Sequence, residues 1–266
     1  MRLYREVRFV LPLPDASSLP SRITNSWAGT HEGGAAGPFC FLRATVEGPI
    51  DERSGYLCDI KRLDELLRGP VAARLAFGSG SGLVRTKSIA DGLAVSMVES
   101  AGSFTGCVRL VELEAGMSPF TRLTVRERDL NMVYLTQAFE FSAAHRLYCP
   151  DRSDEENRRI FGKCSNPHGH GHNYVLEVTV AGEPVDRPGT VVDIGHVDRV
   201  VRERVVGPLD HKNLNTECEE FASMNPTVEN IARVIWKRLS GAWTGCRLAR
   251  VRVWETAKTY AEYCGE

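Results

Sequence analysis

The alternation of apolar and polar residues is clearest in the second half of the chain, where it predicts two strands and a helix. Segments 134–145 and 173–180 are rich in β-branched and aromatic residues, as strands are, and a polar, turn-rich stretch separates them. Apolar residues then recur with a helical period from Ile194 to Val205. Asp193 is suited to cap the start of this helix, and Gly207 with Pro208 predicts its end.

A second helix is predicted after Asn225, with Asn225 as its cap and Pro226 as its first residue. Its apolar residues fall on one helical face, which consists of Ile231, Val234, Ile235 and Leu239. Segments 248–255 and 259–263 have the pattern of strands. The order strand, strand, helix, helix, strand, strand indicates an α+β fold.

The first half repeats this pattern, because the sequence matches itself at a shift of 134 residues. The identities at this single shift are Thr45/Thr179, Val46/Val180, Gly48/Gly182, Gly55/Gly189, Asp59/Asp193, Ile60/Ile194 and Asp64/Asp198. After small gaps, residues 69–70 lie over 207–208, and 108–114 lie over 251–255. We therefore predict two tandem copies, residues 1–128 and 129–266, joined by a charged linker near 126–130.

Composition indicates a globular protein without a nucleic-acid or membrane surface. The 266 residues are 42% hydrophobic and 25% charged, with a formal net charge of −1 and no long run of like charges. The first residues interleave charge with apolar side chains, which argues against a signal peptide or a membrane span, so a cytoplasmic location is expected. The eight cysteines show no paired spacing and are expected to be reduced thiols.

Six of the seven histidines lie between His145 and His211, so histidine chemistry belongs to the second copy. In the run 164–174, His168, His170 and His172 alternate with glycine, and a strand would project all three from one face. Catalytic zinc commonly takes three protein ligands and keeps one position open. His145 is the candidate ligand from outside this run. A structural zinc site, with Cys164 as a fourth ligand, is the alternative.

The first copy has no histidines at the matching positions. Ala36 and Pro38 stand where the shift of 134 places His170 and His172, and neither side chain can bind a metal. The first copy is therefore predicted to keep the scaffold without the metal site.

Six motifs, in order along the second half, resemble those of the 6-pyruvoyltetrahydropterin and 6-carboxytetrahydropterin synthase family. They lie at 141–147, 154–157, 161–164, 169–174, 208–214 and 254–256. The resemblance implies a Zn²⁺ ion bound by His145, His170 and His172. His168 lies outside that set and is expected to be a bystander.

The resemblance also implies that Cys164, Asp210 and His211 form a proton relay. A thiol acts as a base only when its thiolate is stabilised, and Lys163, the histidines or His211 are candidates to do so. Adjacent residues cannot share one face of a strand, so Asp210 and His211 are expected in an irregular turn.

Three further residues are implied to contact the substrate. Glu255 resembles the family's anchor for a pterin, because a carboxylate can accept two N–H groups of the pterin edge. Thr227 and Glu229 resemble additional contacts with the pterin, although Glu229 could equally be a solvated first-turn residue of its helix. In the first copy, Glu112 or Glu114 could mimic Glu255.

The activity implied is that of a zinc-dependent lyase that converts 7,8-dihydroneopterin triphosphate to 6-pyruvoyltetrahydropterin. The five-residue gap between Cys164 and His170 favours this product over 6-carboxytetrahydropterin, the product of the related enzymes of deazapurine synthesis. A catalytically silent pterin-binding module is a further alternative. The implied architecture is two tandem tunnelling-fold (T-fold) units, each a four-stranded antiparallel sheet with two helices on one face, in a homo-oligomer.

Overall fold

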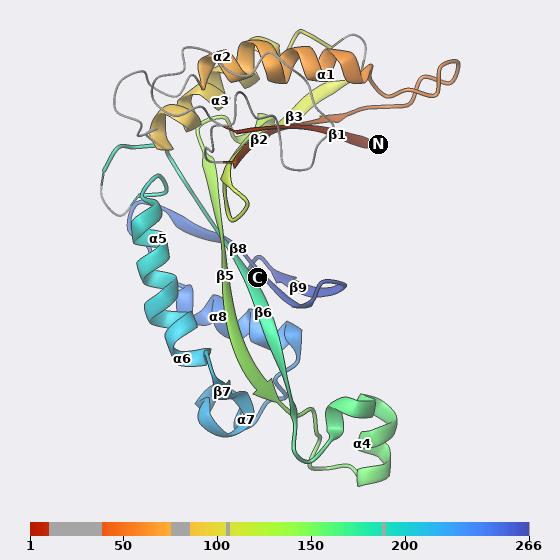
Figure 1. Ribbon diagram of the computed structural model, residues 1–266, viewed down its shortest axis with the longest axis vertical. Helices are drawn as coiled ribbons and strands as arrows, with labels where there is room; N and C mark the ends of the chain where they lie inside the picture. The colour runs from red at the N-terminus through yellow and green to blue at the C-terminus, as the bar shows by residue number, and fades with distance from the viewer. Residues whose placement is uncertain (11–38, 76–85, 105–106, 188–189, 266) are drawn as a thin grey trace. The chain divides into compact units, whose positions relative to one another are not determined.

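The computed structural model describes residues 1–266 except 11–38, 76–85, 105–106, 188–189 and 266. The chain forms two compact units. The first contains Met1–Leu135 and Gly182–Asp193, and the second contains Thr136–Ala181 and Ile194–Glu266. Figure 1 labels the elements, and each unit is described below by itself.

The first unit is a four-stranded antiparallel sheet with helices on one face. Its strands follow the order β1 (Arg2–Val10), β2 (Phe39–Glu47), β3 (Arg109–Ser118) and β4 (Thr121–Arg126). Its helices are α1 (Ile60–Leu66), α2 (Ala72–Arg74) and α3 (Thr86–Ser100), with a π-helical turn at Leu67–Val71 between the first two. Asp59 caps α1 by accepting a hydrogen bond from the backbone N–H of Lys61.

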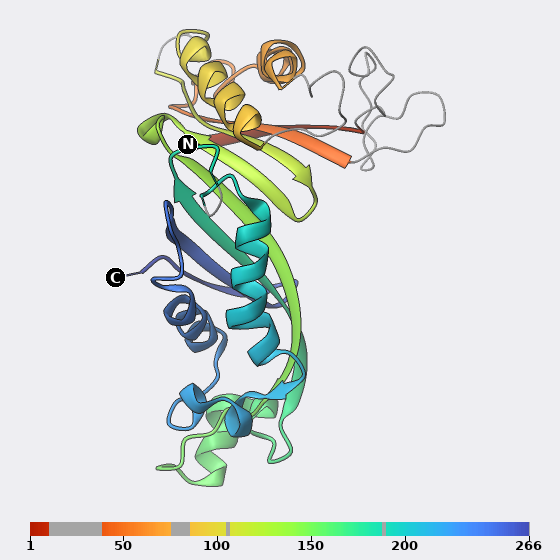
Figure 2. The same ribbon diagram turned by 90° about the vertical axis from the view of Figure 1, so that its left-hand side faces the viewer.

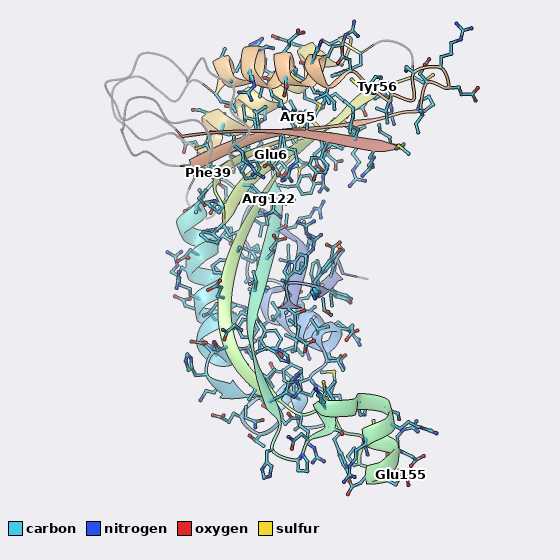
Figure 3. All side chains as sticks on the ribbon, turned by 45° about the vertical axis from the view of Figure 1, so that its right-hand side comes forward. Arg5, Glu6, Phe39, Tyr56, Arg122 and Glu155 are labelled. Atoms are coloured by element: carbon cyan, nitrogen blue, oxygen red, sulfur yellow. The ribbon has the colours of Figure 1, made fainter. Side chains whose placement is uncertain are left out.

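Alternation along the strands divides this sheet into an apolar face and a charged face. Leu42, Ala44 and Val46 are almost completely buried, as is Leu63 of α1. The intervening positions carry charge on the other face, which includes Glu6 and Arg122, both labelled in Figure 3. These charged side chains pair with one another across the strands.

The second unit has the same order of four principal strands: β5 (Val133–His145), β6 (His170–Gly182), β8 (Arg247–Thr256) and β9 (Thr259–Tyr263). Two helices, α5 (Ile194–Val201) and α8 (Val228–Leu239), bury valine, isoleucine and leucine side chains and lie beside this sheet in Figure 2. A short strand, β7 (Lys212–Asn213), pairs in parallel with β5. The remaining helices are α4 (Asp154–Phe161), α6 (Gly207–Leu209) and α7 (Leu214–Glu217).

The α+β class and the antiparallel sheet are confirmed. The two units also share irregularities of register: the pairing shifts after Thr45 and after Thr179, and again between the third and fourth strands of each unit. The second unit differs because α4, α7 and β7 have no counterpart among the described residues of the first. The predicted tandem duplication therefore remains a prediction.

Gly207 and Pro208 do not end the helix as the sequence predicted. After α5, the chain forms a π-helical turn at Arg202–Val206, and α6 places Pro208 in its first turn. A proline is tolerated there because the first N–H groups of a helical turn need no intrahelical partner. The helical segment therefore continues to Leu209, and Asp210 is the first residue after it.

Across the described ranges of the chain, no helix combines the length and the apolar character needed to cross a membrane.

Candidate functional site

Three histidines of the second unit converge at the ends of two strands. His145 is the last residue of β5, and His170 and His172 lie at the start of β6. One ring nitrogen of each lies within 4.8 Å of the others, so the three together could hold a metal ion. Among the residues described in the structure, no other group of this kind is found.

His145 is held in the orientation that a metal ligand requires. It is completely buried, and its Nδ1 lies 2.7 Å from the carbonyl oxygen of Pro226. Since a carbonyl can only accept a hydrogen bond, Nδ1 carries the proton and Nε2 of the neutral ring offers its lone pair. Burial is the main cause that lowers the pKa of His145, and this favours the neutral ring.

The other two rings present buried nitrogens to the same point. His170 Nε2 lies 3.1 Å from His145 Nε2, and His172 Nε2 is buried without a hydrogen-bond partner within the described structure. A buried nitrogen of this kind is costly unless a ligand satisfies it, which fits a metal-binding role. The chemistry of the donor set, three imidazoles, fits zinc.

His168 is not part of this group. It is exposed and lies in the turn before β6 rather than on the strand, so the expectation that all three alternating histidines share one strand face is wrong for His168. Gly169 next to it has a φ of +67°, and a Cβ there would lie 2.8 Å from the backbone oxygen of His145. Only glycine permits this close approach of the two strand ends.

Glu255 lies beside the histidines. It is the bulged residue between Trp254 and Thr256 of β8, where the pairing with β9 shifts register. Its Oε1 is 3.5 Å from His145 Nε2 and 3.4 Å from His172 Nε2. The structure therefore brings the predicted pterin anchor and the predicted metal ligands to one place.

Cys164 lies in a 3-10 turn, Gly162–Ser165, and is partly buried. Burial raises the pKa of its thiol, and the Glu255 carboxylate raises it further. Desolvation and a nearby negative charge both disfavour a thiolate. The expectation that Lys163, the histidines or His211 stabilise the thiolate therefore stays a prediction.

Asp210 and His211 form a hydrogen-bonded pair, and His211 Nδ1 lies 2.9 Å from Asp210 Oδ2. Asp210 also accepts a hydrogen bond from the backbone N–H of Ser142 at 2.8 Å, which is the main cause that lowers its pKa. His211 has a φ of +57°, a left-handed backbone that is uncommon outside glycine and confirms an irregular turn.

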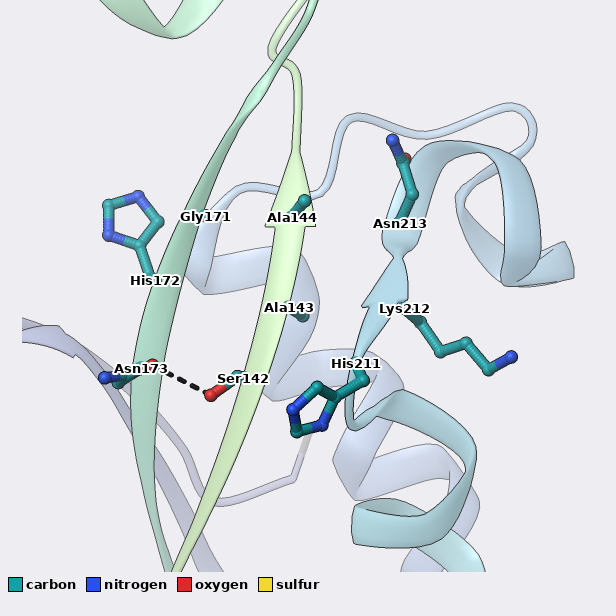
Figure 4. Close-up of a pocket in the computed structure, with 9 residues that line it drawn as sticks. All are labelled: Ser142, Ala143, Ala144, Gly171, His172, Asn173, His211, Lys212 and Asn213. Atoms are coloured by element: carbon teal, nitrogen blue, oxygen red, sulfur yellow. Dashed lines mark hydrogen bonds between the residues drawn. The ribbon is translucent and has the colours of Figure 1, made fainter.

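His211 lines a pocket of about 470 Å³ together with Ser142, His172 and Asn173. Ser142 bonds to Asn173 there, so these two side chains share a face. Since neighbouring strand residues point to opposite faces, His172 projects away from them. In Figure 4 the two strands lie between the His172 and His211 rings.

The structure does not join Cys164 to Asp210 or His211. Within the described part of the chain, no hydrogen bond or ion pair links the cysteine to this pair, and the His211 side chain is 82% exposed. The predicted three-residue relay is therefore not assembled by the contacts of one chain.

The start of α8 differs from the prediction. Thr227, not Asn225, is the N-cap: its backbone is extended, and its hydroxyl accepts a hydrogen bond from the N–H of Asn230. Asn225 instead accepts a hydrogen bond from the N–H of Tyr148 at 2.8 Å. Glu229 is therefore the second residue of the helix, and it is exposed.

Sequence reasoning missed two parts of the site. Nothing in the sequence marked the Pro226 carbonyl as the group that orients His145. Tyr174 was within the motif 169–174 but had no assigned role; it is completely buried, stacks on Phe141 at 5.0 Å, and has a hydroxyl without a partner in the described structure. An apolar-looking strand position occupied by tyrosine rather than phenylalanine was the available signal.

The strand register of the two units shows which residue of the first unit occupies the position that matches Glu255. The shared shifts align Glu112 with Arg250 and Glu114 with Arg252, so Met117 is the bulged residue that matches Glu255. Neither glutamate is therefore placed to mimic Glu255. Ala36 and Pro38, the predicted counterparts of the histidine ligands, lie outside the described residues.

Comparisons with known proteins concern the second half of the chain. The family model described as 6-pyruvoyl tetrahydropterin synthase matches residues 134–266. A 6-pyruvoyl tetrahydrobiopterin synthase of Poecilia reticulata is 41% identical over 133 residues, which is 50% of this chain and 90% of the relative. The human protein of the same name is 42% identical over 132 residues, covering 50% of this chain and 91% of the relative.

More distant relatives include a 6-carboxy-5,6,7,8-tetrahydropterin synthase of Aquifex aeolicus, 27% identical over 158 residues that cover 48% of this chain and 96% of the relative. Among solved structures, the 6-pyruvoyl tetrahydropterin synthase of Caenorhabditis elegans matches with 36% identity and a TM-score of 0.47, over 51% of this chain and 96% of that one. The family match covers the strands and turns that carry the three histidines, Glu255 and Cys164, and on this evidence the chain belongs to the 6-pyruvoyl tetrahydropterin synthase family.

Proposed function

We propose that the protein is a zinc-dependent lyase that converts 7,8-dihydroneopterin triphosphate to 6-pyruvoyltetrahydropterin. The observation that carries the proposal is the histidine group with Glu255 beside it, which combines a three-imidazole metal site with a carboxylate suited to a pterin edge. The 41–42% identity to relatives named 6-pyruvoyl tetrahydrobiopterin synthase supports the same reaction.

In this proposal His145, His170 and His172 hold the metal, and Pro226 keeps His145 in its Nε2-ligating tautomer. A zinc ion at this site would supply Lewis-acid stabilisation of negative charge that develops on the side-chain oxygens of the substrate. Glu255 accepts N–H groups of the pterin and thereby orients the side chain of the substrate. Thr227 and Glu229 remain proposed contacts at the start of α8.

Cys164 takes a proton from a side-chain carbon of the substrate as the C–O bond to triphosphate breaks, so triphosphate leaves with the electron pair. Asp210 orients His211, which passes protons on. Because Cys164 has no contact with this pair in its own chain, we assign the pair to a second copy of the chain in a homo-oligomer. The first unit is not suited to supply it, because residues 72–75, which follow its π-helical turn, contain neither aspartate nor histidine.

Subunit complementation tests this assignment. Cys164→Ala and His211→Ala should each be inactive, whereas co-refolded mixtures should regain up to about a quarter of the activity, because some sites then receive both intact residues. Mixtures as inactive as the parents, with mixed oligomers confirmed by native mass spectrometry, would refute the shared relay.

Product analysis tests the reaction itself. Incubation with 7,8-dihydroneopterin triphosphate should release triphosphate and give the 6-pyruvoyl product by mass spectrometry. Acetaldehyde release would instead indicate the 6-carboxy product. Metal analysis belongs in the same experiment, because bound zinc without turnover would identify a silent pterin-binding module.

We also propose that residues 1–128 are a degenerate copy of the unit formed by 129–266. The shared strand order, the register shifts at matching positions and the identities at a shift of 134 residues support this proposal. An experimental structure in which the shifts of the two units fall at unmatched positions would argue against it.

A further inference from the structure

The position of Glu255 carries an inference beyond its role as a pterin anchor. Its Oε1 faces the Nε2 atoms of His145 and His172, the atoms that the histidines offer to a metal. Within the described structure, these two imidazoles are its only ion-pair partners, and its side chain is only 21% exposed. A carboxylate that served the pterin alone would have no reason to face ligand nitrogens.

The separations match those within one coordination shell. Donor atoms that lie 2.0–2.2 Å from one tetrahedral ion lie about 3.3–3.6 Å from each other. Glu255 Oε1 is 3.5 Å from His145 Nε2 and 3.4 Å from His172 Nε2, and both distances fall within this range. The carboxylate is thus spaced from two of the three histidines as a fourth donor would be.

The local backbone favours this placement. In β8, Glu255 follows Val251 and Val253 on one face of the strand, and their partners in β6 are Val178 and Leu176, so Glu255 lies on the same face of the sheet as His170 and His172. The matching bulged residue of the first unit is Met117, which offers no oxygen. The carboxylate therefore occurs in the unit that has the histidine group.

We propose that Glu255 is the fourth metal donor of the ligand-free protein and leaves the metal when it accepts the N–H groups of a pterin. In the ligand-free protein, four protein donors would then complete the coordination of the metal. Binding of the pterin to Glu255 would free one coordination position for an oxygen of the substrate. The exchange with a pterin rests on the proposed function, whereas ligation by Glu255 in the ligand-free protein does not.

Cobalt(II) replaces zinc as the probe, because its visible absorption reports the donors around it. Glu255→Gln should weaken cobalt binding at least tenfold in competition with a chelator, since even partners outside the coordination shell contribute about 10–100-fold. It should also change the cobalt spectrum before any pterin is added. Glu219→Gln, which removes an exposed carboxylate of the same unit, is the matched control and should change neither property.

Glu255→Asp separates ligation from simple charge attraction. Aspartate keeps the negative charge but is shorter by one methylene, so it should resemble Glu255→Gln in its spectrum if Glu255 is a ligand. If the aspartate variant has the wild-type spectrum and affinity, or if Glu255→Gln retains both, ligation by Glu255 is refuted. Circular dichroism on each metal-free variant verifies that it has folded.

The exchange is tested by adding 7,8-dihydroneopterin, which lacks the triphosphate, to the cobalt protein. The wild-type spectrum should shift on addition, and the shift should be missing in Glu255→Gln. A wild-type spectrum that ignores saturating pterin would overturn the exchange. If the wild-type protein gives all the expected cobalt results but does not convert 7,8-dihydroneopterin triphosphate, the proposed reaction is refuted. Ligation of the metal by Glu255 is then still supported.

Discussion

A buried ion pair in the first unit gives the sharpest stability prediction. Arg43 Nη1 lies 2.9 Å from Glu114 Oε1, and the Glu114 side chain is only 8% exposed. Burial is the main cause that raises the pKa of Glu114, and Arg43 opposes it. Arg43→Met should therefore leave a buried carboxylate with weaker compensation.

The magnitude follows from what remains around Glu114. Breaking a buried pair by removing one partner costs about 3–5 kcal/mol. Arg122 at 3.4 Å and Thr124 at 3.2 Å still contact the carboxylate, and Arg43 is itself about one-third exposed, so we expect about 2–3 kcal/mol. Glu114→Gln removes the buried charge, so the double variant should be destabilised by at least about 1 kcal/mol less than the sum of the single effects.

Hydrogen exchange of β2 and β3 peptides, measured by mass spectrometry, localises the effect to the first unit. The exposed pair Asp198–Arg202 is the matched control, and its double-mutant cycle should give a coupling below about 0.5 kcal/mol. Because burial raises the pKa of Glu114, its carboxylate takes up a proton at a higher pH than an ordinary glutamate does, so the penalty of Arg43→Met should fade as the pH falls toward about 4. A coupling no larger than that of the exposed pair, or a penalty that grows on acidification, would refute the reasoning.

The other predictions concern the candidate site. Tyr174→Phe should stabilise the metal-free protein by about 1 kcal/mol in urea denaturation, because it removes a buried hydroxyl without a partner in the described structure; a clear loss would show that the hydroxyl is bonded. Cys164→Ala should abolish turnover yet retain metal by elemental analysis, and loss of the metal would make the cysteine a ligand. In the metal-free protein, alkylation of Cys164 by iodoacetamide should rise only above about pH 8.5, and Glu255→Gln should move the rise to lower pH; an unchanged profile would contradict the influence of Glu255.

The sequence allowed the main elements of the fold to be predicted, because strand and helix periodicity are local properties. Residues 134–145 and 173–180 were predicted as strands and lie in β5 and β6. The errors came from competition between backbone hydrogen bonds that a pattern does not reveal. The helical segment continues past α5 as a π-helical turn and then as α6, which contains Pro208. The hydroxyl of Thr227 forms the N-cap hydrogen bond that Asn225 was expected to form.

The grouping of the three histidines was predictable because His170 and His172 share a strand face and the family pattern supplies His145. The environment of Cys164 could not be predicted from the sequence, because it depends on where each loop lies relative to the sheet. The alternation of side chains along a strand did predict that Asn173, between His172 and Tyr174, faces away from the three histidines. Only the fold shows that the backbone of Ser142, at the edge of β5, binds Asp210 and the backbone N–H of His211, and so holds this pair without a contact to Cys164 in the described structure.

The charged faces of the two sheets explain how a shared strand order can tolerate different sequences. Positions matched by register carry opposite charges: Arg43 pairs with Glu114 in the first unit, whereas Glu177 pairs with Arg252 in the second. One reversal alone would place like charges side by side at a largely buried position, so the pair must change together. Met117 and Glu255 differ without such a paired exchange of charge, because the ion-pair partners of Glu255 are His145 and His172 rather than an arginine or lysine. The charges of each sheet therefore depend on one another, whereas the residue at the position of Glu255 can differ between the units without a matching change in the sheet.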